Sequence, residues 1–255
     1  MTFPLNPQRL SSGNKALKGI FALLLVFATG SAALAQTDIR AEYNFAPNSQ
    51  VATAVVESWS VDNWGDNYLS AGFGLKAKPV SLGGAWLEYA RNFNFWHQVP
   101  VLKDFSLQAE FNGRVNMDNF NALFGLSYTL PLKGDDVLRF SVLYKTFSGN
   151  ARSSVPAQLT VLWRLYDLFS IQGLVFRGTL KGWGENINYW WGDPNPLEGG
   201  KQYFCIAAQP QLWYAVGQFF GAGKLSIGGE VALSYNWLGC RGFHVYPSAG
   251  VKLQF

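Results

Sequence analysis

The last thirteen residues of the chain, FHVYPSAGVKLQF (243–255), alternate between two kinds of side chain. One face is apolar and holds Val245, Ala249, Val251, Leu253 and Phe255, and the other holds His244, Tyr246, Ser248, Lys252 and Gln254. Alternation over about ten residues is typical of a transmembrane β-strand, whereas strands of soluble sheets usually have about five or six residues. The segment therefore predicts one strand of a membrane barrel and argues against a soluble β-sandwich.

The same alternation recurs along most of the chain. We expect twelve strands, at about 38–46, 50–59, 67–78, 84–96, 104–116, 119–130, 136–148, 154–165, 169–181, 203–217, 224–237 and 243–255. Two of them break the pattern, because parity puts Arg91 on the apolar face of its strand and Arg177 beside Val175. A β-bulge shifts the phase of a strand by one residue and would repair either case.

Aromatic side chains cluster near the ends of these strands. Tyr235, Trp237, Phe243 and Phe255 lie on apolar faces close to strand termini, as expected of an aromatic girdle at the membrane surface. The predicted fold is all-β: a 12-stranded antiparallel transmembrane β-barrel in the bacterial outer membrane. An even number of strands places both termini in the periplasm.

The first 35 residues predict a secretory signal peptide. Basic residues at Arg9, Lys15 and Lys18 precede an apolar stretch from 19 to 29, and a small-x-small sequence, Ala33-Leu34-Ala35, follows. The apolar stretch is too short for a spanning helix, which needs about 20 residues. The expected organisation is a signal peptide at 1–35 and an outer-membrane β-barrel at 36–255.

The composition agrees with a barrel and excludes several other classes. Of the 255 residues, 49% are hydrophobic and 16% aromatic, while 14% are charged, against about 25% in ordinary soluble domains. This balance excludes a disordered chain. The 20 Lys and Arg against 16 Asp and Glu, with no basic run, predict no nucleic-acid binding.

Signals of catalysis are weak. The chain has two histidines, His97 in an expected periplasmic turn and His244 near the opposite rim, so they cannot share a site. No cluster of Cys, His and carboxylates has the spacing of a metal site. We therefore expect no enzyme, no cofactor and no metal.

Charged and aromatic side chains gather on the faces that should point into the barrel, since Lys or Arg facing hydrocarbon costs about 2–4 kcal/mol at the midplane. The residues expected to line a pore or bind a solute are Glu42, Glu57, Trp86, Glu88, Gln108, Glu110, Arg114, Lys145, Arg164, Trp213, Glu230 and Lys252. Both signs of charge are present, which predicts a pore without strong ion preference. The same residues could instead neutralise one another and brace the wall.

Two further features lie near the expected outer side. The one long connection carries Tyr189, Trp190 and Trp191, which could fold over the mouth as a constriction or simply cover the rim. Pairing across the turn at 218–223 puts Cys205 opposite residue 236 or 237, with Cys240 a few residues further on. Export permits oxidation, so the sequence predicts a disulfide between Cys205 and Cys240, with two unbonded thiols as the alternative.

Several segments resemble the nucleoside-specific channel-forming porins (Tsx-like) of the outer membrane. The similar stretches are Glu57-Ser-Trp with Asp62-Asn-Trp64-Gly65, Trp86-Leu-Glu88-Tyr-Ala-Arg91-Asn-Phe93, Pro210-Gln-Leu-Trp213-Tyr and Pro247-Ser-Ala-Gly250-Val-Lys252-Leu-Gln-Phe255. The last two are closer still to an uncharacterised branch of that superfamily common in Bacteroidetes. The resemblance implies a monomeric twelve-stranded barrel with a narrow pore that passes nucleosides.

Two functions remain open from the sequence. The first is a channel for passive uptake of small solutes, with nucleosides as candidates and outer-membrane lipid as its surroundings. The second is a closed barrel that serves as a structural or surface-interaction protein. Twelve strands lie between the filled eight-stranded barrels and the open barrels of sixteen or more, so the strand number does not decide between the two.

Overall fold

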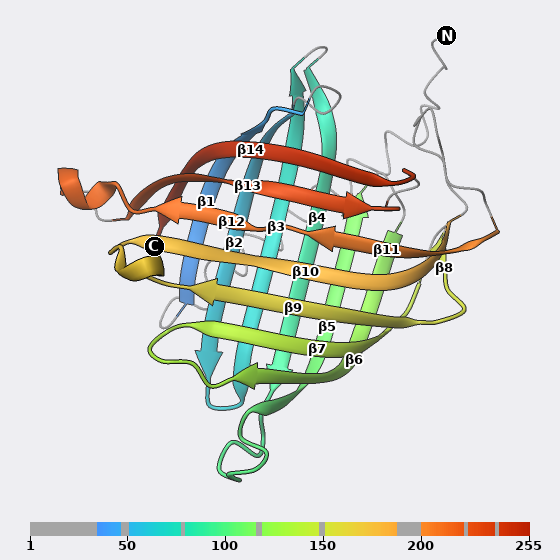
Figure 1. The fold of residues 1–255 in the computed structure, drawn as a ribbon. Helices are drawn as coiled ribbons and strands as arrows, with labels where there is room; N and C mark the ends of the chain where they lie inside the picture. Colours follow the sequence, from blue (N-terminus) through green and yellow to red (C-terminus); the bar gives the residue numbers. More distant parts are fainter. Residues whose placement is uncertain are drawn as a thin grey trace.

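The computed structural model describes residues 35–46, 51–77, 80–115, 119–147, 151–187, 200–221, 224–237 and 240–255, which form a closed antiparallel barrel (Figure 1). Its strands are β1 (Ala35–Asn44), β2 (Val51–Asp62), β3 (Gly65–Ala77), β4 (Val80–Phe93), β5 (Phe105–Val115), β6 (Asn119–Leu130), β7 (Val137–Lys145), β8 (Ala151–Arg152), β9 (Ala157–Leu165), β10 (Leu174–Ile187), β11 (Gln202–Ala208), β12 (Gln211–Tyr214), β13 (Leu225–Tyr235) and β14 (Phe243–Gln254). The barrel closes because β14 pairs with β1 and β9 pairs with β10.

The predicted number of twelve barrel strands is confirmed. The two-residue β8 pairs with the end of β10, and β11 and β12 together take one position between β10 and β13. The connections β2–β3, β4–β5, β6–β7, β9–β10 and β12–β13 lie at one end of the barrel, which we name the turn end. The opposite end is the loop end.

The ninth predicted strand begins five residues later than expected and extends beyond its predicted end. Residues Leu168–Ser170 form a short 3₁₀ helix, η1, in which Phe169 and Ser170 have φ of 56° and 64°. These left-handed conformations are incompatible with a strand. The predicted 203–217 strand likewise ends at Tyr214, ahead of a second 3₁₀ helix, η2 (Gly217–Phe220). No helix in the described part of the chain is long and apolar enough to cross a membrane.

Neither arginine that breaks the alternation is repaired by a bulge. Arg177 points into the barrel in an unshifted strand, where it is 4% exposed. Arg91 stays on the outer face close to the turn end, where its guanidinium binds both carboxylate oxygens of Asp62 at 2.8 and 2.9 Å. The one register shift between β3 and β4 lies elsewhere, where Gly74 faces Gly84 and Leu75 faces Leu82.

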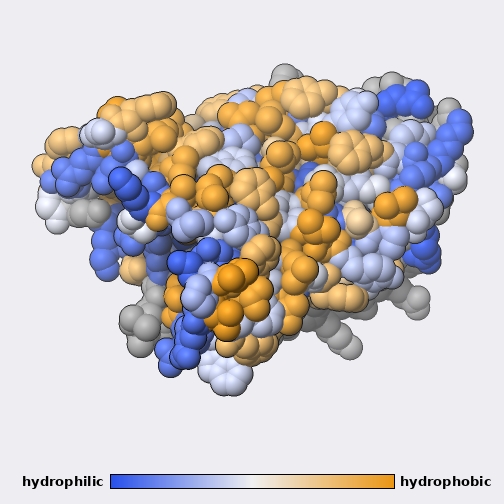
Figure 2. Space-filling view, turned by 60° about the horizontal axis from the view of Figure 1, so that its bottom comes forward, coloured by the Kyte–Doolittle hydropathy of each residue, from blue (hydrophilic) through white to orange (hydrophobic). Residues whose placement is uncertain are grey.

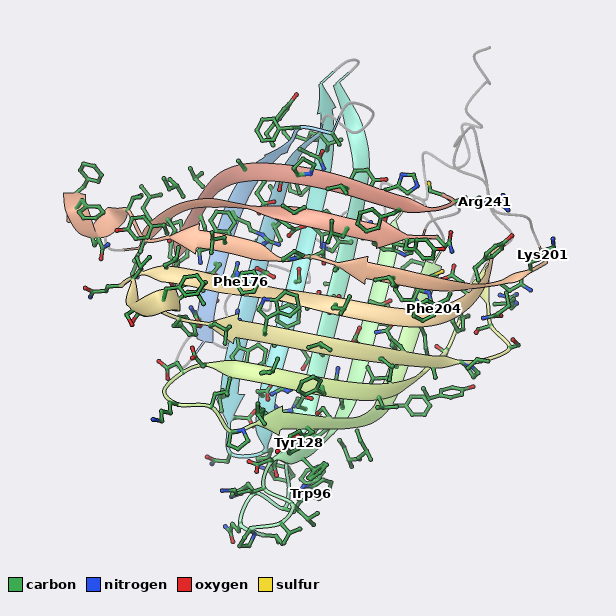
Figure 3. The ribbon with its side chains drawn as sticks, viewed as in Figure 1. Trp96, Tyr128, Phe176, Lys201, Phe204 and Arg241 are labelled. Carbon is green, nitrogen blue, oxygen red and sulfur yellow. The ribbon has the colours of Figure 1, made fainter. Side chains whose placement is uncertain are left out.

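The wall is apolar outside and polar inside. Large side chains such as Phe124, Val142 and Phe204 are more than half exposed on the outer face, while Asp38 and Glu110 inside are 1% and 5% exposed. Figure 2 shows hydrophobic side chains across the middle of the wall and hydrophilic ones toward its two ends. Phe176 and Phe204 lie on the outer face, and Trp96 lies in the connection between β4 and β5 (Figure 3). This inside-out distribution is that of a barrel surrounded by lipid.

Two prolines flank one residue of the wall. Val231 of β13 faces Pro247 of β14, and on its other side its N–H donates to the Pro210 carbonyl at 3.0 Å. Pro210 lies between β11 and β12, in a register that is otherwise continuous. Because proline has no N–H, the β-ladder lacks donors at this level of the sheet.

Candidate functional site: the polar lumen

The twelve side chains that the sequence assigns to a pore all lie on the inner face of the wall. Buried there are Glu42, Glu57, Gln108, Glu110, Lys145, Arg164, Trp213, Glu230 and Lys252, while Trp86, Glu88 and Arg114 border an internal cavity. Period-two alternation accounts for this placement, because successive side chains of a strand point to opposite faces.

A cavity of about 120 Å³ runs along the inside of the barrel. Its lining on β10 extends from Arg177 to Glu185, which corresponds to roughly 26 Å of strand at about 3.3 Å per residue. Of the predicted pore residues, Glu57, Trp86, Glu88, Arg114, Lys145 and Arg164 border this cavity. The other six are packed among the polar groups around it.

Strand β10 sends two cations across the lumen. Lys181 Nζ lies 2.7 Å from Glu88 Oε2 on β4 and 3.2 Å from Glu110 Oε1 on β5. Arg177 pairs with Asp38 on β1 and, at 2.7 Å, with Glu57 on β2. Four or five strand positions separate these partners around the barrel, so the ion pairs join facing walls.

A second charged group joins β1, β2 and β13. The Arg40 guanidinium lies 3.3 Å from Glu42, 3.5 Å from Glu57 and 3.6 Å from Glu230. Its Nε and Nη1 atoms are buried and form no hydrogen bond within the part of the protein that is described. Three carboxylates thus lie around one cation at distances longer than an ordinary charged hydrogen bond.

Polar contacts fill the lumen near the turn end. Arg139 on β7 binds Asp66 on β3 through two hydrogen bonds of 2.9 and 2.6 Å. The same carboxylate accepts from Asn92, whose own oxygen accepts from Ser127 at 3.0 Å. Arg139 also lies over the ring of Trp59, 5.2 Å from its centroid. This network joins β3, β4, β6 and β7 close to the turn end.

Aromatic rings and cations narrow the loop end. Trp183 of β10 and Trp237 meet edge to face with centroids 6.1 Å apart. Lys145 lies over the Trp183 ring at 4.1 Å and Arg114 over the Trp237 ring at 4.5 Å. These four side chains, which we name the aromatic mouth, all border the cavity.

The prediction that Trp237 belongs to an outer aromatic girdle is wrong. Strand β13 ends at Tyr235, and Asn236 has φ of 50°, which turns the chain so that the indole contacts the lumen cation Arg114. Asn236 is held in this strained conformation by its Oδ1 atom, which accepts from the N–H of Gly242 at 2.9 Å, and by its own N–H, which donates to the Gly242 carbonyl at 3.0 Å.

The structure does not join Cys205 to Cys240. The predicted register is confirmed, since Cys205 lies beside residue 236, but its thiol is directed elsewhere: it donates to the carbonyl of Asn236 at 3.0 Å. Cys205 is fully buried against Trp183 and Ala207, inside the barrel. Both cysteines are therefore free thiols in this structure.

Other predicted features lie apart from the lumen or outside the described residues. Tyr189, Trp190 and Trp191, the proposed loop constriction, lie outside them. His97 contacts the carbonyl of Asn94 in the connection after β4, and His244 contacts that of Arg241 near the start of β14. The two histidines are therefore at opposite ends of the barrel. No metal-binding group of His, Cys, Asp and Glu occurs among the residues described.

The inward face of β10 is not among the predicted pore residues. Arg177 appears as a break in parity and the predicted strand ends at 181, so the prediction does not include Lys181, Trp183 and Glu185. Their spacing of two residues from Arg177 onward is the signal that could have found them, since positions 177, 181, 183 and 185 share one face.

The fold and this lumen define a transmembrane β-barrel protein with a charged, partly filled interior. Residues 37–255 match the model of a family described as a domain of unknown function, DUF5020, and the chain belongs to that family. No match was found among the curated proteins.

Solved structures with a similar chain course include outer-membrane porins. "KdgM porin" is 12% identical over 86% of this chain and 99% of that one, with a TM-score of 0.47. "KdgM porin in complex with disordered oligogalacturonate" is 14% identical over 86% and 99%, at 0.45. Pseudomonas aeruginosa OpdQ is 8% identical over 87% and 95%, at 0.34.

Proposed function

We propose that the protein is an outer-membrane channel for passive uptake of small solutes, and that it is not an enzyme. The observation that carries this proposal is the elongated cavity, whose lining follows β10 from Arg177 to Glu185. Because barrel strands are tilted by about 35–45°, this length of strand covers about 20 Å of the apolar band, which is about 25 Å tall. The twelve strands close within one chain, so a monomer is sufficient for function, and residues 1–35 would direct export as a signal peptide.

Nucleosides are our candidate solutes within this function. Trp86 borders the cavity, and two atoms of its six-membered ring, Cζ2 and Cη2, lie 2.5 and 2.6 Å from the position that a Cβ on Gly72 would take. The indole thus lies against bare backbone and can offer a face for stacking a planar base. Nearby, Asn121 is buried and its Oδ1 atom has no hydrogen-bond partner in the described structure. An N–H or O–H of a solute would satisfy it.

Single-channel recording with purified protein in planar bilayers tests the channel. We expect stable unitary currents in 1 M KCl, and liposomes containing the protein should swell in uridine. Trp86→Leu should slow uridine entry more than glycerol entry, while Trp96→Leu, in the connection after β4, should change neither. A folded protein that gives no current contradicts the proposal.

The second candidate, a closed structural barrel, rests on the ion pairs that cross the lumen from Lys181 and Arg177. If these pairs seal the interior, the protein will insert into bilayers without conducting.

Residues 189–191 could add a further constriction at the loop end. Deletion of 188–199, which leaves β10 intact, should then raise the current, and an unchanged current would show that this connection is not in the conducting path.

A further inference from the structure

Two cations that border the cavity rest on aromatic rings instead of carboxylates. Lys145 is 5% exposed, and its Nζ atom lies 4.1 Å from the centroid of the Trp183 ring and 5.3 Å from that of Phe147. Arg164 is 6% exposed and lies 4.9 Å from the centroid of the Trp59 ring. Neither forms an ion pair with a carboxylate of the described residues within 4.0 Å.

The other arrangement, a cation paired with an acid, is common in the same lumen. Arg40 and Arg177 both contact Glu57, and Lys181 contacts Glu88 and Glu110. Pairing cancels most of the field of these groups along the cavity. An aromatic ring attracts a cation through its quadrupole but carries no net charge, so the charges of Lys145 and Arg164 are not cancelled by their rings.

The charged side chains that border the cavity are unequal in sign. The cations are Arg40, Arg114, Lys145, Arg164, Arg177 and Lys181. The carboxylates are Glu57, Glu88 and Glu185. Four further carboxylates help to balance the cations but do not border the cavity themselves: Asp38, Glu42, Glu110 and Glu230. A solute in the cavity is therefore closer to more positive than negative charge.

We propose that Lys145 and Arg164 give this channel a preference for anions and hold the anionic group, carboxylate or phosphate, of a passing solute. The inference rests on the proposed channel function and deepens it. Lys145 lies at the aromatic mouth, while Arg164 pairs in register with Arg177 further toward the turn end, so an anion meets the two in succession. Rings of Lys and Arg side chains are the usual device of anion pores, and low-dielectric walls strengthen their field.

Reversal potentials of single channels in a tenfold KCl gradient test this inference. The wild type should favour chloride over potassium by at least about twofold, in keeping with a net positive lining. Lys145→Gln and Arg164→Gln should each reduce that preference, and the double variant should abolish it. Lys145→Arg and Arg164→Lys keep the charges and should retain it. Arg91→Gln removes a cation from the outer face and should leave the reversal potential unchanged.

A second readout addresses solute binding. Inorganic phosphate or acetate added to one side should reduce the chloride current of the wild type, and should do so much less in the double variant. No current from folded wild-type protein would overturn the channel function and this inference together. A current without chloride preference, or a preference that the double variant keeps, would overturn the inference alone and leave the channel intact.

Discussion

Lys181 on β10 reaches across the barrel to Glu88 on β4, with 2.7 Å between Nζ and Oε2. Glu110 on β5, the strand next to β4, lies 3.2 Å from the same ammonium group. One cation thus ties the wall that carries β10 to two strands of the facing wall. Removal of one partner leaves an uncompensated buried charge, which is costly, whereas removal of both partners is far milder.

Lys181→Met should therefore destabilise the barrel by about 3–5 kcal/mol. Adding Glu88→Gln should restore part of the loss, because one of the two unpaired carboxylates is then neutral. Urea unfolding in lipid vesicles, arranged as a double-mutant cycle, measures the coupling. The folded double variant should also conduct more than the wild type, because a bridge across the lumen is gone. Additive destabilisation with an unchanged current would show that the pair neither couples the walls nor obstructs the path.

Trp237→Ala should raise the current, because Trp237 forms part of the aromatic mouth with Trp183. Asn236→Ala should act in the same direction by a different route: alanine tolerates φ of 50° poorly and cannot accept from the Gly242 N–H, so the indole loses its support. Asn236→Gly keeps the backbone conformation available and should have a smaller effect than Asn236→Ala. If all three variants carry the same current as the wild type, Trp237 lies outside the conducting path.

Gly72→Ala should displace the indole of Trp86. The added Cβ would lie 2.5 Å from Cζ2 of the ring and 2.9 Å from the carbonyl oxygen of Ala54, so the ring must move into the cavity. We expect a lower conductance and slower uridine entry. Gly182→Ala is the matched control on β10, because its nearest atom is the Cζ of Phe204 at 3.3 Å. Identical behaviour of the two variants would argue against a role for this ring.

Asp66→Ala should destabilise the barrel far more than Asp62→Ala, although both remove the partner of an arginine. Asp66 is buried and holds Arg139 through two hydrogen bonds, so its loss should cost about 3–5 kcal/mol. Asp62 has a side chain that is 49% exposed, and an exposed pair contributes about 1 kcal/mol or less. Urea midpoints measured in the same vesicles give both values, and costs of similar size would contradict the burial of the Asp66 pair.

The barrel could be predicted from the sequence because lipid and lumen impose opposite demands on alternate residues. The alternation in 243–255 and 105–115 appears unchanged as β14 and β5, and it placed Glu110 and Lys252 inside. Strand ends were harder to predict, because η1 depends on left-handed backbone at Phe169 and Ser170, which are residue types that rarely adopt it. A local pattern predicts which face a side chain is on, but not where its strand stops.

The contacts in the lumen join strands that face each other across the barrel. A local sequence pattern carries no information about which strands do so. Arg177 looked like an error on an apolar face, yet it binds acids on β1 and β2, more than a hundred residues away in sequence. The alternation predicts Trp237 on the outer face, but the left-handed backbone of a single residue, Asn236, turns the chain so that the indole points into the lumen. The disulfide prediction is wrong although the register on which it rests is right: Cys205 lies beside Asn236 and its thiol donates to the carbonyl of that residue.

The two prolines beside Val231 also bear on how the barrel opens. At that position the chain cannot supply the backbone donors that its neighbours supply, and Val231 itself faces outward, toward lipid, where water cannot replace them. Pro210 removes one donor between β12 and β13, and Pro247, whose carbonyl accepts from the Phe45 N–H, removes one between β14 and β1. Deuterium should enter the amides next to these two positions before it enters those of β5 and β6, and thermal opening of the barrel should begin at these two seams.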